Sequence, residues 1–286
     1  MRVVLITPRP DHPLLAAATA LLRPDHRVEV IDPATAAAAP QCAEPERPLA
    51  DVYLLKARTP RALALAHALE RHGAVVVNSA AATARCQDRT RMAGLAHRAG
   101  LPFVRGRTVG ALRELAGLQP TRPLVVKSRY SRRGDLVARV DGAREIRALC
   151  GIWGSEPVVV QPFAANDGWD RKLWVISGQL FAGLRRSELA EDSPAGPAGR
   201  EPAEPLAPGD LPRDWYDLAL RTGAAFGLEV YGLDLVDGGG GPLIVDVNAF
   251  PGIRGQAGAP RALAELVLRK GAAARSATGA ERSPGR

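Results

Sequence analysis

Three oxygen-bearing side chains lie in a glycine-interrupted segment at 228–255. Two apolar runs flank the four glycines at 238–241, a pattern typical of a β-hairpin. Side chains alternate between the faces of a strand, so Asp246 and Asn248 share one face. Asp234 joins them if the hairpin register places it opposite Asp246.

Two carboxylates that face each other among apolar residues repel one another and lose solvation, and a bound cation relieves both effects. Carboxylate and amide oxygens suit magnesium better than zinc, and magnesium also binds substrate phosphates. The pattern therefore predicts half of a nucleotide–metal site on Asp234, Asp246 and Asn248. The alternative is that both aspartates lie on the solvent-exposed face of an edge hairpin.

Two lysines on predicted strands are candidates for contact with phosphate groups. Lys127 lies in the apolar run at 123–130, and Lys172 lies in a hairpin that turns at Ser177–Gly178. Each can neutralise the α and β phosphates of a nucleotide, and the turn at 131–135 can fold over them with its backbone N–H groups. The alternative for each lysine is an exposed charge on a strand.

The strand at 157–163 offers a place where the backbone can bind adenine. Gln161 precedes Pro162, which has no N–H group. The candidate pair is therefore the carbonyl of Pro162 and the N–H of Ala164, with Phe163 between them.

The elements that must position these residues fall into two units. Residues 1 to about 85 alternate between strands and helices, which predicts an open parallel α/β unit. Its first turn has no GxGxxG, which argues against dinucleotide binding. The second unit begins near Asp88 and ends with a helix at 261–270. We expect a mobile loop at 193–210 and a disordered tail at 271–286.

The composition is that of an ordinary soluble globular protein, with 286 residues, 46% of them hydrophobic and 24% charged. No apolar run reaches the roughly 20 residues that a membrane span needs, and no signal-peptide pattern is present, so we expect a cytoplasmic protein. The three cysteines are widely spaced without CxxC, which argues against a zinc ribbon or a disulfide framework. The net charge of +8 fits a basic cleft for anionic substrates or simply an arginine-rich composition, and no aromatic-rich basic stripe favours nucleic acid.

The order of these features resembles the ATP-grasp superfamily from about residue 88 to 268. The spacing D-x-K-x-x-V-x-x-G at 170–178, followed by Arg185–Arg186, is similar to the ribosomal-S6-modification (RimK-like) type of amino-acid ligase. The segment DVNAFPG at 246–252 is also similar to the inositol-trisphosphate 5/6-kinases. Arg89 lies where many ATP-grasp ligases carry a nucleotide-binding lysine.

The resemblance implies an α/β (α+β) protein with an N-terminal open parallel α/β domain at 1–85 and an ATP-grasp domain at 86–270. Two ATP-grasp subdomains would enclose the nucleotide. It implies ATP and Mg²⁺ as cofactors. The residues it assigns to ATP are Arg89, Lys127, Gln161, Pro162, Phe163, Ala164 and Lys172.

The activity implied is ADP-forming ligation of a small-molecule carboxylate to an amine, such as an amino acid or peptide, through an acyl phosphate. Lys172 and one of Arg185 and Arg186 would be catalytic, because neighbours on a strand face opposite ways. Two alternatives remain: a kinase that phosphorylates a polyol phosphate, and a non-catalytic ATP-binding protein.

Overall fold

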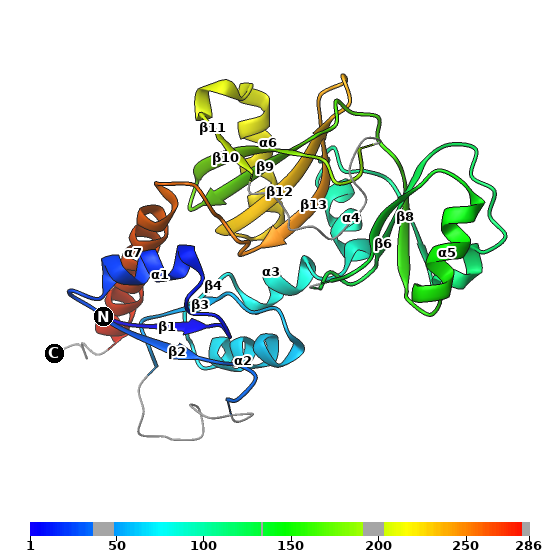
Figure 1. Ribbon diagram of the computed structural model, residues 1–286. Helices are drawn as coiled ribbons and strands as arrows, with labels where there is room; N and C mark the ends of the chain where they lie inside the picture. The colour runs from blue at the N-terminus through cyan, green and yellow to red at the C-terminus, as the bar shows by residue number, and fades with distance from the viewer. Residues whose placement is uncertain (37–48, 133, 191–202, 282–286) are drawn as a thin grey trace.

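The structure is a computed structural model that describes residues 1–36, 49–132, 134–190 and 203–281. Three lobes are visible, each built on its own β-sheet (Figure 1). One sheet is parallel and two are antiparallel, which agrees with the α/β (α+β) class expected from the sequence. No helix within these ranges is long and apolar enough to cross a membrane.

The N-terminal lobe is the parallel α/β unit that the alternating pattern predicts. Its strands and helices are β1 (Arg2–Ile6), α1 (Pro13–Leu22), β2 (Arg27–Ile31), β3 (Val52–Leu55), α2 (Pro60–Arg71), β4 (Val76–Val77) and α3 (Ala80–Arg85). The strand order is β2-β1-β3-β4. Because side chains alternate along a strand, Val4 and Ile6 pack in the cluster with α2, and Val3 and Leu5 pack in the cluster with α1. The predicted boundary at 85/86 falls between α3 and the next helix.

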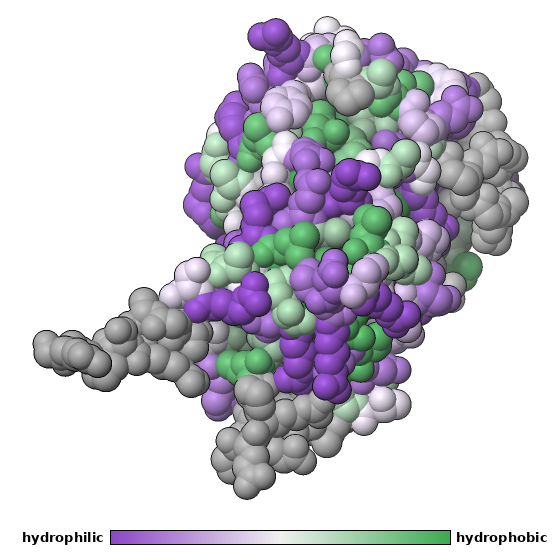
Figure 2. All heavy atoms as spheres, turned by 90° about the vertical axis from the view of Figure 1, so that its left-hand side faces the viewer, coloured by the Kyte–Doolittle hydropathy of each residue, from purple (hydrophilic) through white to green (hydrophobic). Residues whose placement is uncertain are grey.

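Helix α7 (Ala259–Glu281) returns from the far end of the sequence to the N-terminal lobe, where it packs beside α1 and against β3 (Figure 1). The expectation of a disordered tail from residue 271 is therefore wrong for 271–281, and 282–286 lie outside the described residues. At Gly271 this helix packs closely on the N-terminal lobe, because a Cβ at this position would collide with the Met1 sulfur. The missing side chain lets the helix lie directly on the N-terminal strand, and Figure 2 shows polar and apolar side chains interspersed on this side of the molecule.

The central lobe is a four-stranded antiparallel sheet with one covered face. Its elements are β5 (Arg107–Val109), η1 (Leu112–Leu115), β6 (Leu124–Ser128), β7 (Val137–Val140), α5 (Ala143–Trp153) and β8 (Val158–Pro162), with the strand order β5-β8-β6-β7. Val126 and Val160 pack in the cluster with Ile146 of α5. Lys127 and Gln161, one residue further along their strands, therefore belong to the opposite face.

The C-terminal lobe carries the longest strands. Helix α4 (Arg89–Arg98) precedes the central lobe in the sequence. The elements of the C-terminal lobe itself are β9 (Trp169–Ile176), β10 (Gln179–Arg186), β11 (Glu204–Leu206), η2 (Pro208–Asp210), α6 (Arg213–Phe226), β12 (Val230–Asp237) and β13 (Pro242–Ala249). The sheet order is β11-β10-β9-β12-β13. β11 and η2 correct the expectation of an irregular loop for 204–210, and the part at 191–202 lies outside the described residues.

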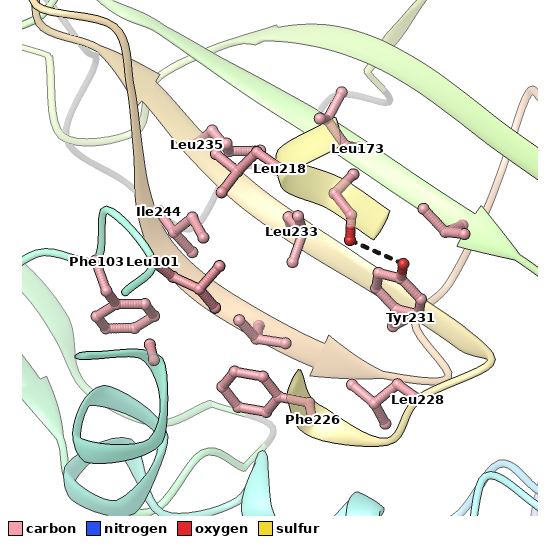
Figure 3. Close-up of a cluster of buried hydrophobic side chains, with 14 of the residues drawn as sticks. Leu101, Phe103, Leu173, Leu218, Phe226, Leu228, Tyr231, Leu233, Leu235 and Ile244 are labelled. Carbon is pink, nitrogen blue, oxygen red and sulfur yellow. Dashed lines mark hydrogen bonds between the residues drawn. The ribbon is translucent and has the colours of Figure 1, made fainter. Parts of the chain in front are cut away.

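One face of this sheet forms the main apolar core (Figure 3). Leu218 and Phe226 of α6 pack against Leu233 and Leu235 of β12, and the hydroxyl of Tyr231 donates to the carbonyl of Ala219 at 2.9 Å. Because Leu233 and Leu235 face this core, Asp234 between them points to the other face of the sheet. The second face is therefore the one on which polar side chains can meet a ligand.

Candidate nucleotide and metal site

The hairpin of β12 and β13 brings the three predicted metal ligands to one face. Asp234 lies directly opposite Asp246, which meets the condition set by the sequence analysis, and Asn248 follows two residues later on the same strand. A β-bulge between Asp234 and Leu235 adds Val245 to one strand only. The bulge lets Ile244 face the apolar core while Asp246, two residues further on, points to the other side.

Protein cations already neutralise the two aspartates. Arg89 lies 3.1 Å from a carboxylate oxygen of Asp246, and the ammonium of Lys172 lies 2.9 Å from Asp234, its direct neighbour across the strands. The repulsion expected from the sequence is thus relieved without a metal ion. A metal bound here would compete with Arg89 and Lys172 for these oxygens.

Arg89 connects three elements at the centre of the site. It begins α4, which Asp88 caps by accepting from the N–H of Thr90, and its guanidinium donates to Ser128 O at 2.8 Å, to Asp135 at 2.6 Å and to Asp246 at 3.1 Å. Burial alone would raise the pKa of Asp246, but the charges of Arg89 and Lys127 outweigh it and hold the pKa below its usual value. Asp246 is therefore a carboxylate at neutral pH.

Lys127 reaches the same site from the central lobe. Its ammonium donates to Val245 O at 2.9 Å, the carbonyl of the bulged residue. Burial lowers the pKa of Lys127, and the negative charge of Asp246 partly opposes this effect. The structure therefore brings Lys127 and the aspartate pair together from two lobes, as the sequence predicts.

The hairpin of β9 and β10 decides between the two adjacent arginines. Arg185 is paired in register with Asp170, forms an ion pair with it at 3.1 Å, and shares the face of Lys172. Arg186 is paired with Trp169 on the opposite face, where its guanidinium lies 5.6 Å from the indole ring centre. Only one of the two lies on the face of the aspartates, as expected, and it is Arg185.

The predicted adenine segment ends β8 beside the lysine. Gln161 is buried on the same face as Lys127. The N–H of Phe163 donates to Pro123 O at 2.9 Å, and the guanidinium of Arg139 lies 4.3 Å from the phenyl ring centre. Within the described part of the chain, the N–H of Ala164, which follows Pro162 and Phe163, donates to no other residue, so it is available to a ligand.

Two acidic residues complete the charge network that the sequence indicated only in part. Asp135 ends the turn that we expect to cover phosphates with its backbone, and its carboxylate forms an ion pair with Arg89 at 2.6 Å. Asp170, the first residue of the D-x-K spacing, lies 3.6 Å from Lys172 as well as next to Arg185. Both aspartates lie near basic residues in the sequence, which was the available signal for a charged network. Their actual ion-pair partners could not be read from the sequence, because these depend on how the lobes pack.

The donor set fits magnesium. Among the described residues no three His, Cys, Asp or Glu side chains gather as a metal site. Two carboxylates and one amide, from Asp234, Asp246 and Asn248, form a smaller set of oxygen ligands. Such a set suits magnesium, which keeps several waters and takes further oxygens from a bound phosphate.

Comparison with known proteins agrees with this architecture. The chain is 28% identical over 203 residues to a protein of Xanthomonas campestris pv. campestris described as "Probable alpha-L-glutamate ligase". The match covers 66% of each chain. The chain spans about half to two thirds of the length of the curated relatives it matches.

Solved structures match over nearly the whole chain. A RimK domain ATP-grasp protein from Sphaerobacter thermophilus has a TM-score of 0.69 at 24% identity, with 94% of this chain and 100% of that chain covered. The ATP-grasp ligase PsnB with a minimal precursor, Mg and ADP has a TM-score of 0.66 at 18% identity, with 94% and 97% covered. These likenesses confirm the predicted ATP-grasp fold.

A family model of the RimK-like ATP-grasp domain matches residues 111–259, which is more than half of the chain. This stretch begins at η1 and ends at the start of α7, so it includes Lys127, both hairpins and the aspartate pair. The chain belongs to the RimK-like ATP-grasp family.

Proposed function

We propose that the protein is an ATP- and Mg²⁺-dependent ligase that joins a carboxylate to an amine through an acyl phosphate. One observation carries the proposal: Lys127 of the central lobe and Lys172 of the C-terminal lobe converge on the pair Asp234–Asp246. This arrangement has the charges that phosphoryl transfer needs, because such catalysis consists mainly of positioning and of stabilising negative charge.

Each residue of the site has a role in this reaction. Lys127 and Lys172 bind the α and β phosphates of ATP, while the segment 161–164 holds the adenine ring. Asp234, Asp246 and Asn248 would hold magnesium, which would supply positive charge to offset that of the phosphate groups. Lys172 exchanges Asp234 for phosphate as the nucleotide enters.

Arg185 holds the acid substrate. A planar guanidinium matches a carboxylate and an acyl phosphate alike, and Arg185 already binds the carboxylate of Asp170 at 3.1 Å. An oxygen of the substrate carboxylate attacks the γ-phosphorus, and the bond to ADP breaks. The amine then attacks the acyl carbon, loses a proton, and displaces phosphate to leave an amide.

The curated relatives suggest glutamate as a substrate to test first. They are described as probable alpha-L-glutamate ligases, and an acidic amino acid suits a protein with a net charge of +8. We propose that one substrate is an amino acid of this kind, and that the other is an amino acid or peptide.

Hydroxylamine trapping tests the reaction together with the two adjacent arginines. The wild-type protein, given ATP, magnesium and a suitable acid, should yield a hydroxamate. Arg185→Lys should lower turnover by about a hundredfold with little change in ATP affinity, because the charge remains but the two-pronged contact is lost. Arg186→Lys, on the opposite face, is the matched control and should change turnover less than about threefold.

Two results would replace this proposal. If a broad set of acids gives no hydroxamate while a polyol phosphate gains phosphate from ATP, the protein is a kinase. If neither product forms and ATP still binds, the protein is a non-catalytic ATP-binding member of the family.

A further inference from the structure

A group of basic side chains gathers where the strand order of the N-terminal sheet reverses. Because β2 and β3 lie on opposite sides of β1, the loops after β1 and β3 separate at their carboxyl ends. Open α/β sheets bind ligands at this position. Arg9 follows β1, and Lys56 and Arg58 follow β3.

The loop that follows the metal ligands lies over these strand ends. The ammonium of Lys56 donates to Phe250 O at 2.9 Å and to Pro251 O at 3.0 Å. On the same loop, Gly252 packs against the ring of His12, so that a Cβ at Gly252 would come within 3.1 Å of Nε2. The loop therefore joins the N-terminal lobe to the candidate active site and brings Arg254 to the same place.

The charges at this place are almost all positive. Arg58, Arg9 and Arg254 each act electrostatically on Lys56, and together with burial, the larger cause, they lower its pKa to about 7. Burial, Lys56, Arg254 and Arg9 lower the pKa of His12 to about 4, and Asp11 opposes them. Like charges held together destabilise the free protein, and an anion would relieve this repulsion.

The basic cluster of Arg9, Lys56, Arg58 and Arg254 also adjoins the aspartate pair. Pro251, whose carbonyl Lys56 binds, is the third residue after Asn248, a distance of at most about 10 Å along the chain. A small molecule held by the cluster can therefore extend to the place where an acyl phosphate would form.

We propose that the basic cluster binds the negative groups of the amine substrate, a dicarboxylic amino acid, and directs its amine toward the acyl phosphate. The cluster contains three guanidinium groups, each of which can bind a carboxylate with two hydrogen bonds. The identity of the ligand rests on the proposed ligase reaction, whereas the anion site itself does not. A polyol phosphate also carries several negative charges, and the experiment distinguishes it from a dicarboxylic amino acid.

Equilibrium binding measures the site without relying on turnover. Arg58→Gln and Arg254→Gln, singly and together, leave Lys56 and its two carbonyl contacts in place. Labelled L-glutamate and labelled inositol trisphosphate are titrated into each full-length variant with a non-hydrolysable ATP analogue and magnesium present. Arg23→Gln removes the same charge from the exposed end of α1, one helix length of about 15 Å from His12, and is the matched control.

We expect glutamate binding to weaken at least tenfold in each single variant and further in the double variant. The control should keep wild-type affinity, the affinity for the ATP analogue should not change, and the melting temperature should stay equal or rise because repulsion is relieved. Unchanged glutamate binding in the double variant would refute the inference, even if the wild type forms a hydroxamate.

The remaining outcomes separate the ligand from the reaction. If only inositol trisphosphate binding depends on the two arginines, the assignment of an amino acid is wrong and the kinase alternative gains support. If glutamate binding depends on them but no hydroxamate or amide forms, the site is supported and the ligase reaction is not.

Discussion

Replacing Arg89 with methionine tests whether charge balance at the aspartate pair holds the lobes together. The side chain is 7% exposed and donates to Ser128 O, Asp135 and Asp246, which belong to different elements. Removing one partner of a buried ion pair costs about 3–5 kcal/mol. Lys127 remains near Asp246, so we expect the free energy of unfolding to fall by about 3–5 kcal/mol rather than by the sum of three contacts.

Urea-induced unfolding at several pH values measures this loss. The folded-state pKa of Asp246 lies below its usual value of 3.8, so its ionised form stabilises the protein above that pH and ceases to do so as the pH falls through the folded-state pKa. The difference between wild type and Arg89→Met should therefore be constant near neutral pH and shrink below about pH 4.

The control lies two residues along the same helix. The side chain of Arg91 is 78% exposed and lies 3.8 Å from Asp88, so Arg91→Met should cost less than about 1 kcal/mol. A loss for Arg89→Met that is no larger than for Arg91→Met, or a difference that does not depend on pH, would refute the argument.

Three further predictions concern single side chains. Asp246→Ala should weaken magnesium-dependent ATP binding in calorimetry, and wild-type affinity in this variant would refute the metal assignment. Lys127→Met and Lys172→Met should each weaken ATP by about tenfold or more and adenosine much less, since each removes a contact worth about 1.5–3 kcal/mol; equal weakening of both ligands would indicate a folding defect. Lys56 has a folded-state pKa of about 7 instead of 10.5, so the unfolded chain binds more protons between these values. The stability of wild type relative to Lys56→Met should therefore rise from pH 7 to about 10.5, and a flat difference would contradict the burial of this ammonium among Arg9, Arg58 and Arg254.

Local patterns in the sequence predicted the parts of the site that depend on strand geometry. The glycine tract and its apolar flanks indicated the hairpin, and the two-residue period of a strand placed Asp246 beside Asn248. The same period predicted that only one of Arg185 and Arg186 reaches the site. It could not say which, because the answer depends on which face of β10 packs against α6.

Contacts between lobes were beyond prediction from single-sequence patterns. The bulge at Val245 interrupts the period of β13, and it supplies the carbonyl that Lys127 binds from another sheet. The ion pair of Arg89 with Asp135 joins residues 46 positions apart. The composition of 271–281 favoured disorder, yet the segment continues α7, and Gly271 lies against Met1 and Val52 of the N-terminal lobe.

The return of α7 to the N-terminal lobe constrains the order in which the protein can fold during synthesis. Val3, Leu5, Val52 and Leu54 of the parallel sheet share a core with Leu263 and Val267 of α7, about 200 residues later in the sequence. At a synthesis rate of about 5–20 residues per second, the ribosome takes roughly 10–40 s to make the intervening chain. During that time α1 lies on one face of the first sheet without the helix that packs beside it in the folded protein. The N-terminal lobe therefore completes its core last, although it is made first, and the nascent chain exposes this apolar face until α7 has emerged.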